Sequence, residues 1–157
     1  MNTRMLSRMQ VLCSRREYCT QDIRRKLTGG KTPCSAEEAD AVIRDLKKDK
    51  YLDDARYAGA FARDKASLTG WGATRIRYAL AAKGISEEDI RQALETVDAG
   101  RSSDRLRRLL QARMKTLAPA TDRRRKLLRF ALSRGYSYDE VSVILQEMTQ
   151  ENEENED

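Results

Sequence analysis

The sequence predicts an all-α protein of three tandem three-helix repeats, about nine helices, stacked into an elongated, curved right- or left-handed array. Ser35, Ser86 and Ser137 stand 51 residues apart, and each opens a Ser-x-x-acid box that precedes an apolar helical stretch. In such a box the serine hydroxyl and the acid side chain together satisfy two free backbone donors at a helix start. Only two prolines, Pro33 and Pro119, interrupt the chain, so long helices are allowed.

The first repeat is predicted over residues 4–52. An amphipathic stretch runs from about Thr3 to Tyr18, a second helix starts near Thr20 and stops at Gly29-Gly30, and Ser35 caps the third. The residues predicted to face inward are Met5, Leu6, Met9, Leu12, Cys13, Ile23, Leu27, Ala39, Val42, Ile43 and Leu46.

The second repeat, residues 53–100, opens at Tyr51-Leu52-Asp53-Asp54. With Asp53 as the N-cap, Leu52 and Tyr57 have the spacing of a hydrophobic staple, and Asp54 lies favourably against the helix dipole. The alternative is a metal-binding carboxylate pair at Asp53 and Asp54. A hard cation would need further converging carboxylates, which the spacing does not supply, so the cap is favoured.

Two glycine motifs shape the rest of this repeat. In Gly70-Trp71-Gly72 the indole either packs in the core or turn, or is presented to a base or partner. In Lys83-Gly84-Ile85 a left-handed Gly84 would let Ile85 pack back on Leu80, as a Schellman ending requires, and Ser86 then starts the next helix. The residues predicted inward in this repeat are Ala58, Phe61, Ala62, Ile76, Leu80, Ile90, Ala93, Leu94 and Val97.

The third repeat, residues 101–150, holds most of the positive charge. Residues 101–134 contain twelve Arg or Lys, ten of them Arg, against the two acids Asp104 and Asp122. The net charge is only +6 because residues 151–157 hold five acids. Helices are predicted near 103–116, near 121–134 and after Ser137. Their inward residues are Leu106, Leu109, Leu110, Leu127, Leu128, Ala131, Val141, Ile144, Leu145 and Met148.

The acidic end, residues 151–157, is predicted to be a disordered tail. It either serves solubility or folds back on the basic third repeat and competes with nucleic acid.

Composition excludes several function classes. The chain has no histidine, which removes His-based metal sites, Ser-His triads and Cys-His dyads. Its three cysteines, Cys13, Cys19 and Cys34, lack C-x-x-C spacing and are expected to be reduced thiols of a cytoplasmic protein. Neither a bilayer-spanning stretch nor an apolar signal core is found, so no membrane role is expected. No cofactor, metal or catalytic residue is assigned, and an enzyme is the least favoured class.

The basic residues are the candidate binding site. The usual interpretation of a charge run is solubility, but the scarcity of local acids and the excess of arginine favour contact with phosphates or carboxylates. The predicted contact residues are Arg123, Arg124, Arg125, Lys126, Arg129 and Arg134, with a smaller strip of Arg75, Arg77 and Lys83 beside Trp71.

Several motifs together resemble the RecX family of bacterial regulators of recombination. They are Tyr51-Leu52-Asp53-Asp54-x-Arg56-Tyr57-Ala58, Gly70-Trp71-Gly72, Lys83-Gly84-Ile85 and Arg134-Gly135-Tyr136-Ser137. The resemblance implies an elongated helical modulator of the RecA recombinase without catalytic activity. Members bind the RecA–DNA nucleoprotein filament, restrain its growth, ATP hydrolysis, strand exchange and co-protease activity, and in some cases bind DNA weakly.

Two binding functions therefore stand side by side. The first is a monomeric regulator that contacts the RecA filament and binds single- or double-stranded DNA weakly through the basic third repeat. The second is a general helical protein that coats DNA or RNA, for which binding would depend steeply on salt and be lost when the cluster at 123–129 is neutralised.

Overall fold

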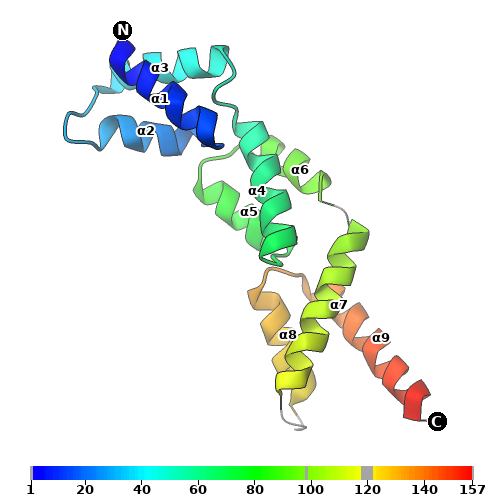
Figure 1. Cartoon of the computed structure of the whole chain (residues 1–157). Helices are drawn as coiled ribbons and strands as arrows, with labels where there is room; N and C mark the ends of the chain where they lie inside the picture. The colour runs from blue at the N-terminus through cyan, green and yellow to red at the C-terminus, as the bar shows by residue number, and fades with distance from the viewer. Residues whose placement is uncertain (1, 98, 118–121, 157) are drawn as a thin grey trace. The chain divides into compact units, whose positions relative to one another are not determined.

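The computed structural model describes residues 2–97, 99–117 and 122–156 (Figure 1). Over these ranges the chain forms nine helices and no strand, which confirms the predicted all-α class. The helices are α1 Thr3–Arg15, α2 Thr20–Thr28, α3 Ala36–Lys48, α4 Asp54–Leu68, α5 Ala73–Ala82, α6 Glu87–Glu95, α7 Ala99–Thr116, α8 Arg123–Ser133 and α9 Tyr138–Glu156.

Contacts divide the chain into two compact units, and the division passes through α4 and α5. Unit 1 contains Met1–Phe61 and Ala79–Ala93, and unit 2 contains Ala62–Tyr78 and Leu94–Asp157. The middle sequence repeat thus contributes to both units. The three repeat boundaries remain a prediction from the sequence period.

All three predicted serine caps are present. Ser35, Ser86 and Ser137 each accept a hydrogen bond at 3.2 Å from the backbone N–H three residues on. In the third box the Glu140 carboxylate also accepts from the N–H of Ser137 at 2.8 Å, which completes the reciprocal pair. The 51-residue period of the sequence is therefore a period of helix starts.

Unit 1 is built around α3, which packs against both α1 and α2. The carboxylate of Asp53 accepts from the N–H of Arg56 at 3.1 Å, which confirms it as a cap of α4. Asp54 also accepts from the N–H of Thr20 at 2.7 Å and so holds the start of α2, a contact across 34 positions. One buried core cluster of unit 1 consists of Met9, Tyr18, Ile23, Leu27, Cys34, Ala39, Val42, Ile43, Leu46 and Leu52.

Unit 2 contains a three-helix bundle in which α7, α8 and α9 all pack on one another. Its buried core consists of Leu106, Leu110, Leu127, Ala131, Tyr136, Val141, Ile144, Leu145 and Met148. Most of these residues lie on the predicted inward stripes. Tyr136 is an addition, and Leu109 and Leu128 pack against the cluster at partial exposure.

The predicted Schellman ending at Gly84 is confirmed. Gly84 has φ +77°, and the N–H of Ile85 donates to the carbonyl of Leu80 at 3.2 Å. The same ending recurs 51 residues later at Gly135, which has φ +96°. There the N–H of Tyr136 donates to the carbonyl of Ala131 at 3.2 Å.

Three boundaries differ from the prediction. α1 ends at Arg15 rather than near Tyr18, and α7 begins at Ala99 rather than near Ser103. The acidic end was predicted to be disordered, but α9 continues through residues 151–156. Extending a helix that is already packed costs little free energy, because nucleation is the expensive step. The first turn of α9 also holds Asp139 and Glu140, which interact favourably with the helix dipole.

Candidate nucleic-acid interface

The first turn of α5 meets the last turn of α8 inside unit 2. The N–H of Gly72 donates to the carbonyl of Arg134 at 2.8 Å, and the N–H of Thr74 donates to the carbonyl of Gly135 at 3.0 Å. Free donors at a helix start are thereby matched to free acceptors at a helix end, and the two helix dipoles meet with opposite charge. This junction fixes the positions of the side chains that surround it.

Two side chains reinforce the junction. The hydroxyl of Tyr136 donates to the carbonyl of Gly70 at 3.0 Å, and the guanidinium of Arg75 donates to the carbonyl of Ser133 at 3.3 Å. Burial raises the pKa of Tyr136, so its hydroxyl keeps its proton and remains a donor through neutral pH. Gly70, with φ +71°, ends α4 and directs the chain into this contact.

Trp71 lies half-buried beside the junction under two cations. The ring centroid is 4.2 Å from Cζ of Arg75 and 4.7 Å from Nζ of Lys65. Of the two interpretations of the Gly-Trp-Gly motif, turn packing is present, yet the indole also faces positive charge. Such cation–π contacts hold the cations over the ring and keep them near the surface.

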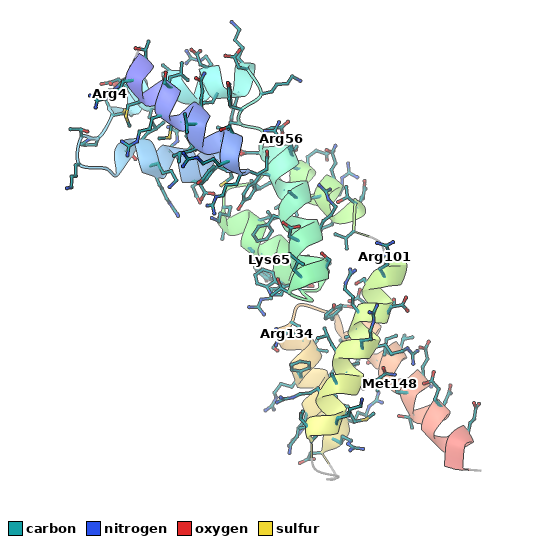
Figure 2. All side chains as sticks on the ribbon, viewed as in Figure 1. Arg4, Arg56, Lys65, Arg101, Arg134 and Met148 are labelled. Atoms are coloured by element: carbon teal, nitrogen blue, oxygen red, sulfur yellow. The ribbon has the colours of Figure 1, made fainter. Side chains whose placement is uncertain are left out.

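Phe130 repeats this arrangement on α8. Its ring centroid is 5.2 Å from Cζ of Arg113 on α7 and 5.2 Å from Cζ of Arg134. Arg134 supplies the carbonyl that Gly72 binds, so the two aromatic groups are linked through the junction. We call this set the junction surface; it consists of Lys65, Trp71, Arg75, Arg113, Phe130 and Arg134. Figure 2 shows Lys65 at the end of α4 and Arg134 at the end of α8.

The sequence placed only part of this surface among its candidates. Arg75, Trp71 and Arg134 were named, whereas Lys65, Arg113 and Phe130 were missed. Phe130 could have been predicted, because it follows Arg129 inside a basic run and an aromatic ring there can be covered by arginines. Arg77, also a candidate, is exposed on α5.

The other candidates form a second group along α8, and four of them lie in its first turn, about 15 Å from Arg134 by helical rise. We call it the α8 cluster; it consists of Arg123, Arg124, Arg125, Lys126 and Arg129. All are exposed except Arg123, which is half-buried. Among the described residues, the α8 cluster makes one ion pair. It joins Arg125 to Asp122 at 3.2 Å, and both side chains are well exposed.

The α8 cluster opposes the dipole of its own helix. The first turn of α8 contains no acid, and the N-cap Asp122 makes no capping bond with its side chain. Cations at the positive end of a helix destabilise it by a few tenths of a kcal/mol each. Solubility alone would not require cations at this helix end. A bound phosphate would offset their unfavourable interaction with the helix dipole.

Lys83 does not join either group. It lies in unit 1, where its Nζ is 2.9 Å from the carboxylate of Asp22. This hydrogen bond raises the pKa of Lys83. Burial acts to raise the pKa of Asp22, but hydrogen bonds from Lys83 and Cys19 outweigh it, and the pKa of Asp22 is lowered. Lys83 therefore stabilises unit 1, and its role in binding stays a prediction.

Replacing Lys83 with glutamine is expected to lower the free energy of unfolding by about 0.5–1 kcal/mol and to leave DNA affinity unchanged. The pair stabilises the fold from above the unfolded pKa of Asp22, about 4, to below that of Lys83, about 10. The difference from wild type should vanish as the pH falls below 4. Urea unfolding and DNA anisotropy measure both effects, with Arg91→Gln, on an exposed face of α6, as the control. Loss of DNA affinity in Lys83→Gln alone would restore its binding role.

Among the side chains that the structure describes, the acidic end of α9 meets the basic bundle at Arg107. Arg107 of α7 pairs with Glu147 and, at 3.0 Å, with Glu151. This removes Arg107 from the free positive charge of unit 2. Arg75, Arg113 and Arg134 keep their guanidinium groups over aromatic rings.

Comparison with known proteins identifies the family. The family models of the second and third three-helix domains of RecX match residues 53–94 and 102–145. A regulatory protein RecX of Neisseria meningitidis serogroup A is 32% identical over 148 residues, covering 93% of this chain and 92% of the relative. The chain belongs to the RecX family of regulatory proteins.

Other RecX proteins differ in length. A regulatory protein RecX of Clostridium botulinum (strain Eklund 17B / Type B) is 35% identical over 106 residues, which are 65% of this chain but 49% of the relative. The alignment thus spans about half the length of that relative. Two crystal structures agree in fold. A regulatory protein RecX has TM-score 0.81 and 25% identity, covering 92% of this chain and 71% of that one. RecX from Lactobacillus salivarius has TM-score 0.82 and 19% identity, covering 94% and 96%.

The described residues hold no group of three or more His, Cys, Asp or Glu side chains placed to bind a metal ion. Within the described ranges, every helix falls short of the length and apolar character that a bilayer crossing requires. Unit 2 presents arginines, which can bind phosphates, and partly exposed aromatic rings, on which planar groups such as bases can stack.

Proposed function

We propose that this chain binds a RecA–DNA nucleoprotein filament in the bacterial cytoplasm and inhibits its growth, ATPase, strand exchange and co-protease activities. It would thereby modulate DNA recombination, repair and the SOS response. Its place in the RecX family supports the partner, because the family is one of recombination regulators. The observation that carries the proposal is the positive surface of unit 2, in which arginines surround two aromatic rings.

The geometry of this surface suits filament-bound DNA. Arginine binds phosphate oxygens through two parallel hydrogen bonds, and the α8 cluster presents several such groups in one turn. Trp71 and Phe130 offer faces on which bases can stack, an interaction worth about 1–3 kcal/mol per base. Positive groups can also meet acids on the recombinase, so one surface serves both components of a nucleoprotein filament.

Contact with both DNA and recombinase would account for the inhibition. A monomer that bridges DNA and recombinase subunits opposes the subunit movements that accompany nucleotide hydrolysis, and at a filament end it blocks addition of the next subunit. Neither step requires bond chemistry or a cofactor from this chain. Differential affinity for one filament state is sufficient, since a ligand shifts a conformational equilibrium by the difference in its binding free energies.

Purified protein is expected to lower the DNA-dependent ATPase of a RecA recombinase at well below one copy per recombinase monomer. Substoichiometric action is expected because one bound molecule restrains or caps a run of subunits. The measurement titrates the protein at fixed recombinase while the amount of single-stranded DNA is varied. The inhibiting concentration should scale with filaments rather than with free DNA.

A second candidate function is general coating of DNA or RNA, which the concentration of charge on unit 2 favours on its own. The same titration distinguishes the two. If inhibition required saturation of all free DNA, and rose and fell with DNA alone, nucleic-acid coating would replace filament contact as the function.

A further inference from the structure

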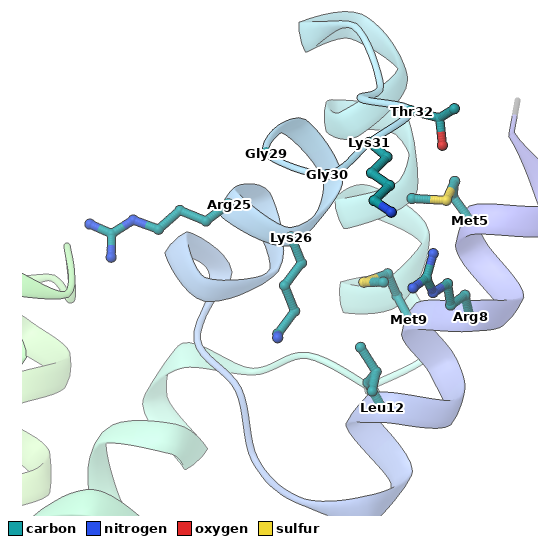
Figure 3. Close-up of a pocket in the computed structure, with 10 residues that line it drawn as sticks. All are labelled: Met5, Arg8, Met9, Leu12, Arg25, Lys26, Gly29, Gly30, Lys31 and Thr32. Carbon is teal, nitrogen blue, oxygen red and sulfur yellow. The ribbon is translucent and has the colours of Figure 1, made fainter.

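A groove of about 500 Å³ lies in unit 1 between α1, α2 and the turn that follows α2 (Figure 3). Its floor is apolar and consists of Met5, Met9 and Leu12 of α1. Met9 is 2% exposed and belongs to the core, whereas Met5 and Leu12 are half-buried. Methionine is unbranched and polarizable, so a methionine floor adapts to the shape of an incoming side chain.

Four cations line the same groove: Arg8 of α1, Arg25 and Lys26 of α2, and Lys31 of the turn. Among the described residues, no carboxylate lies within ion-pair distance of any of them. Three other cations of unit 1 are paired, as Arg24–Asp40, Arg56–Glu17 and Lys83–Asp22. The groove therefore collects uncompensated positive charge, one residue along α2 from a paired arginine.

The helix dipole explains only part of this arrangement. Arg25 and Lys26 lie in the last turn of α2, where positive charge is favourable. Arg8 is in the middle of α1 and Lys31 is beyond the end of α2, so neither gains from a helix end. Arg8, Lys26 and Lys31 face the groove from three segments, whereas the Arg25 side chain points away from it (Figure 3). The three convergent cations indicate a common anionic occupant.

The turn beside the groove begins with two glycines, which have no side chains to obstruct it. Gly29 and Gly30 are both exposed and line the opening. A Cβ at Gly29 would lie 2.7 Å from the carbonyl oxygen of Arg25, so this position requires glycine, whereas Gly30 has open space. A backbone can therefore approach the rim closely.

We infer that this groove binds an acidic peptide segment of a partner protein, with an apolar side chain of the segment on the methionine floor and its carboxylates on Arg8, Lys26 and Lys31. A peptide fits better than nucleic acid, because no aromatic residue lines the groove for a base to stack on. The site uses none of the residues of the unit 2 surface, so it goes beyond the function proposed above.

The test uses the full chain and a fluorescent peptide in which aspartates and glutamates flank two leucines one helical turn apart. Binding by anisotropy is compared with two sister peptides, one with Asn and Gln for the acids and one with Ala for the leucines. The groove variant is Arg8→Glu with Lys31→Glu, and Lys31→Gln is a milder version on an exposed turn. Arg44→Glu with Lys48→Glu, on exposed positions of α3, is the charge-matched control for the double variant.

The acidic peptide should bind wild type and the control equally, and at least about tenfold more weakly to the double variant. Lys31→Gln should weaken it about twofold to fivefold, and loss of either the acids or the leucines should weaken it in wild type. Failure of the acidic peptide to bind, or equal binding to wild type and double variant, overturns the inference. The inference is also overturned if oligo(dT) competes with the peptide and the double variant no longer binds oligo(dT), because the groove would then be a nucleic-acid site. The unit 2 surface is intact in every variant, so these outcomes leave the filament proposal untouched.

Discussion

Alanine in place of Gly135 is expected to lower the free energy of unfolding by about 3 kcal/mol or more. Gly135 has φ +96°, where an L-residue is strained, and its added Cβ would overlap the backbone and Cβ of Arg75. Because Arg75 belongs to α5 and its neighbour Thr74 bonds to the Gly135 carbonyl, the methyl group cannot be accommodated without separating the two helices. Gly72→Ala should have a similar cost, since its Cβ would meet the Gly135 carbonyl.

Gly84→Ala is the control for backbone strain alone. Gly84 has φ +77°, yet the nearest atom to its added Cβ is the flexible side-chain amide of Gln21 at 3.7 Å, so a cost of about 1 kcal/mol is expected. Urea unfolding gives the free energies. The emission of Trp71, the one tryptophan of the chain, reports the junction directly. Equal costs at Gly84 and Gly135, with unchanged Trp71 emission, would show that the junction contributes no stability.

The contrast between these glycines shows what the sequence could predict. Gly84 ends a helix through contacts within a few residues, and its Schellman geometry followed from Lys83-Gly84-Ile85 alone. Gly72 and Gly135 are 63 positions apart, and their mutual approach depends on how α5 and α8 pack. Local periodicity predicts helices, caps and inward stripes, because these are set by neighbours in sequence. Pairing between distant helix ends is set by tertiary packing, which one sequence does not reveal.

The same distinction holds for the binding surface. The density of charge in residues 101–134 was visible by counting, and five of its arginines and lysines form the α8 cluster. The cations over Trp71 and Phe130 could not be assigned, since Lys65 and Arg113 reach their rings from the end of α4 and from another helix. The ion pair of Lys83 was missed for a related reason. Asp22, the partner of Lys83, lies 61 positions away, so the sequence does not show that the charge of Lys83 is paired.

Replacing Arg124, Arg125, Lys126 and Arg129 with glutamine is expected to weaken DNA binding at least tenfold at about 0.15 M salt. Four cations are removed from an exposed face, and each lost phosphate contact lowers the slope of log K against log salt by about 0.7–0.9. The fold should be retained or slightly stabilised, because positive charges are removed from the first turn of α8, where they oppose the dipole. Loss of binding with unchanged or higher stability would separate function from folding.

The matched control replaces Arg4, Arg15, Arg44 and Lys48 of unit 1, which are likewise three arginines and one lysine on exposed positions. Both variants lose the same net charge, so equal loss of affinity would mean that DNA responds only to total charge and not to the α8 cluster. The decisive comparison is on the recombinase filament. If the chain contacts recombinase as well as DNA, the α8 variant should retain measurable filament binding after its affinity for bare DNA is lost. If filament binding disappears in parallel with DNA binding over a full salt titration, the protein acts through nucleic acid alone.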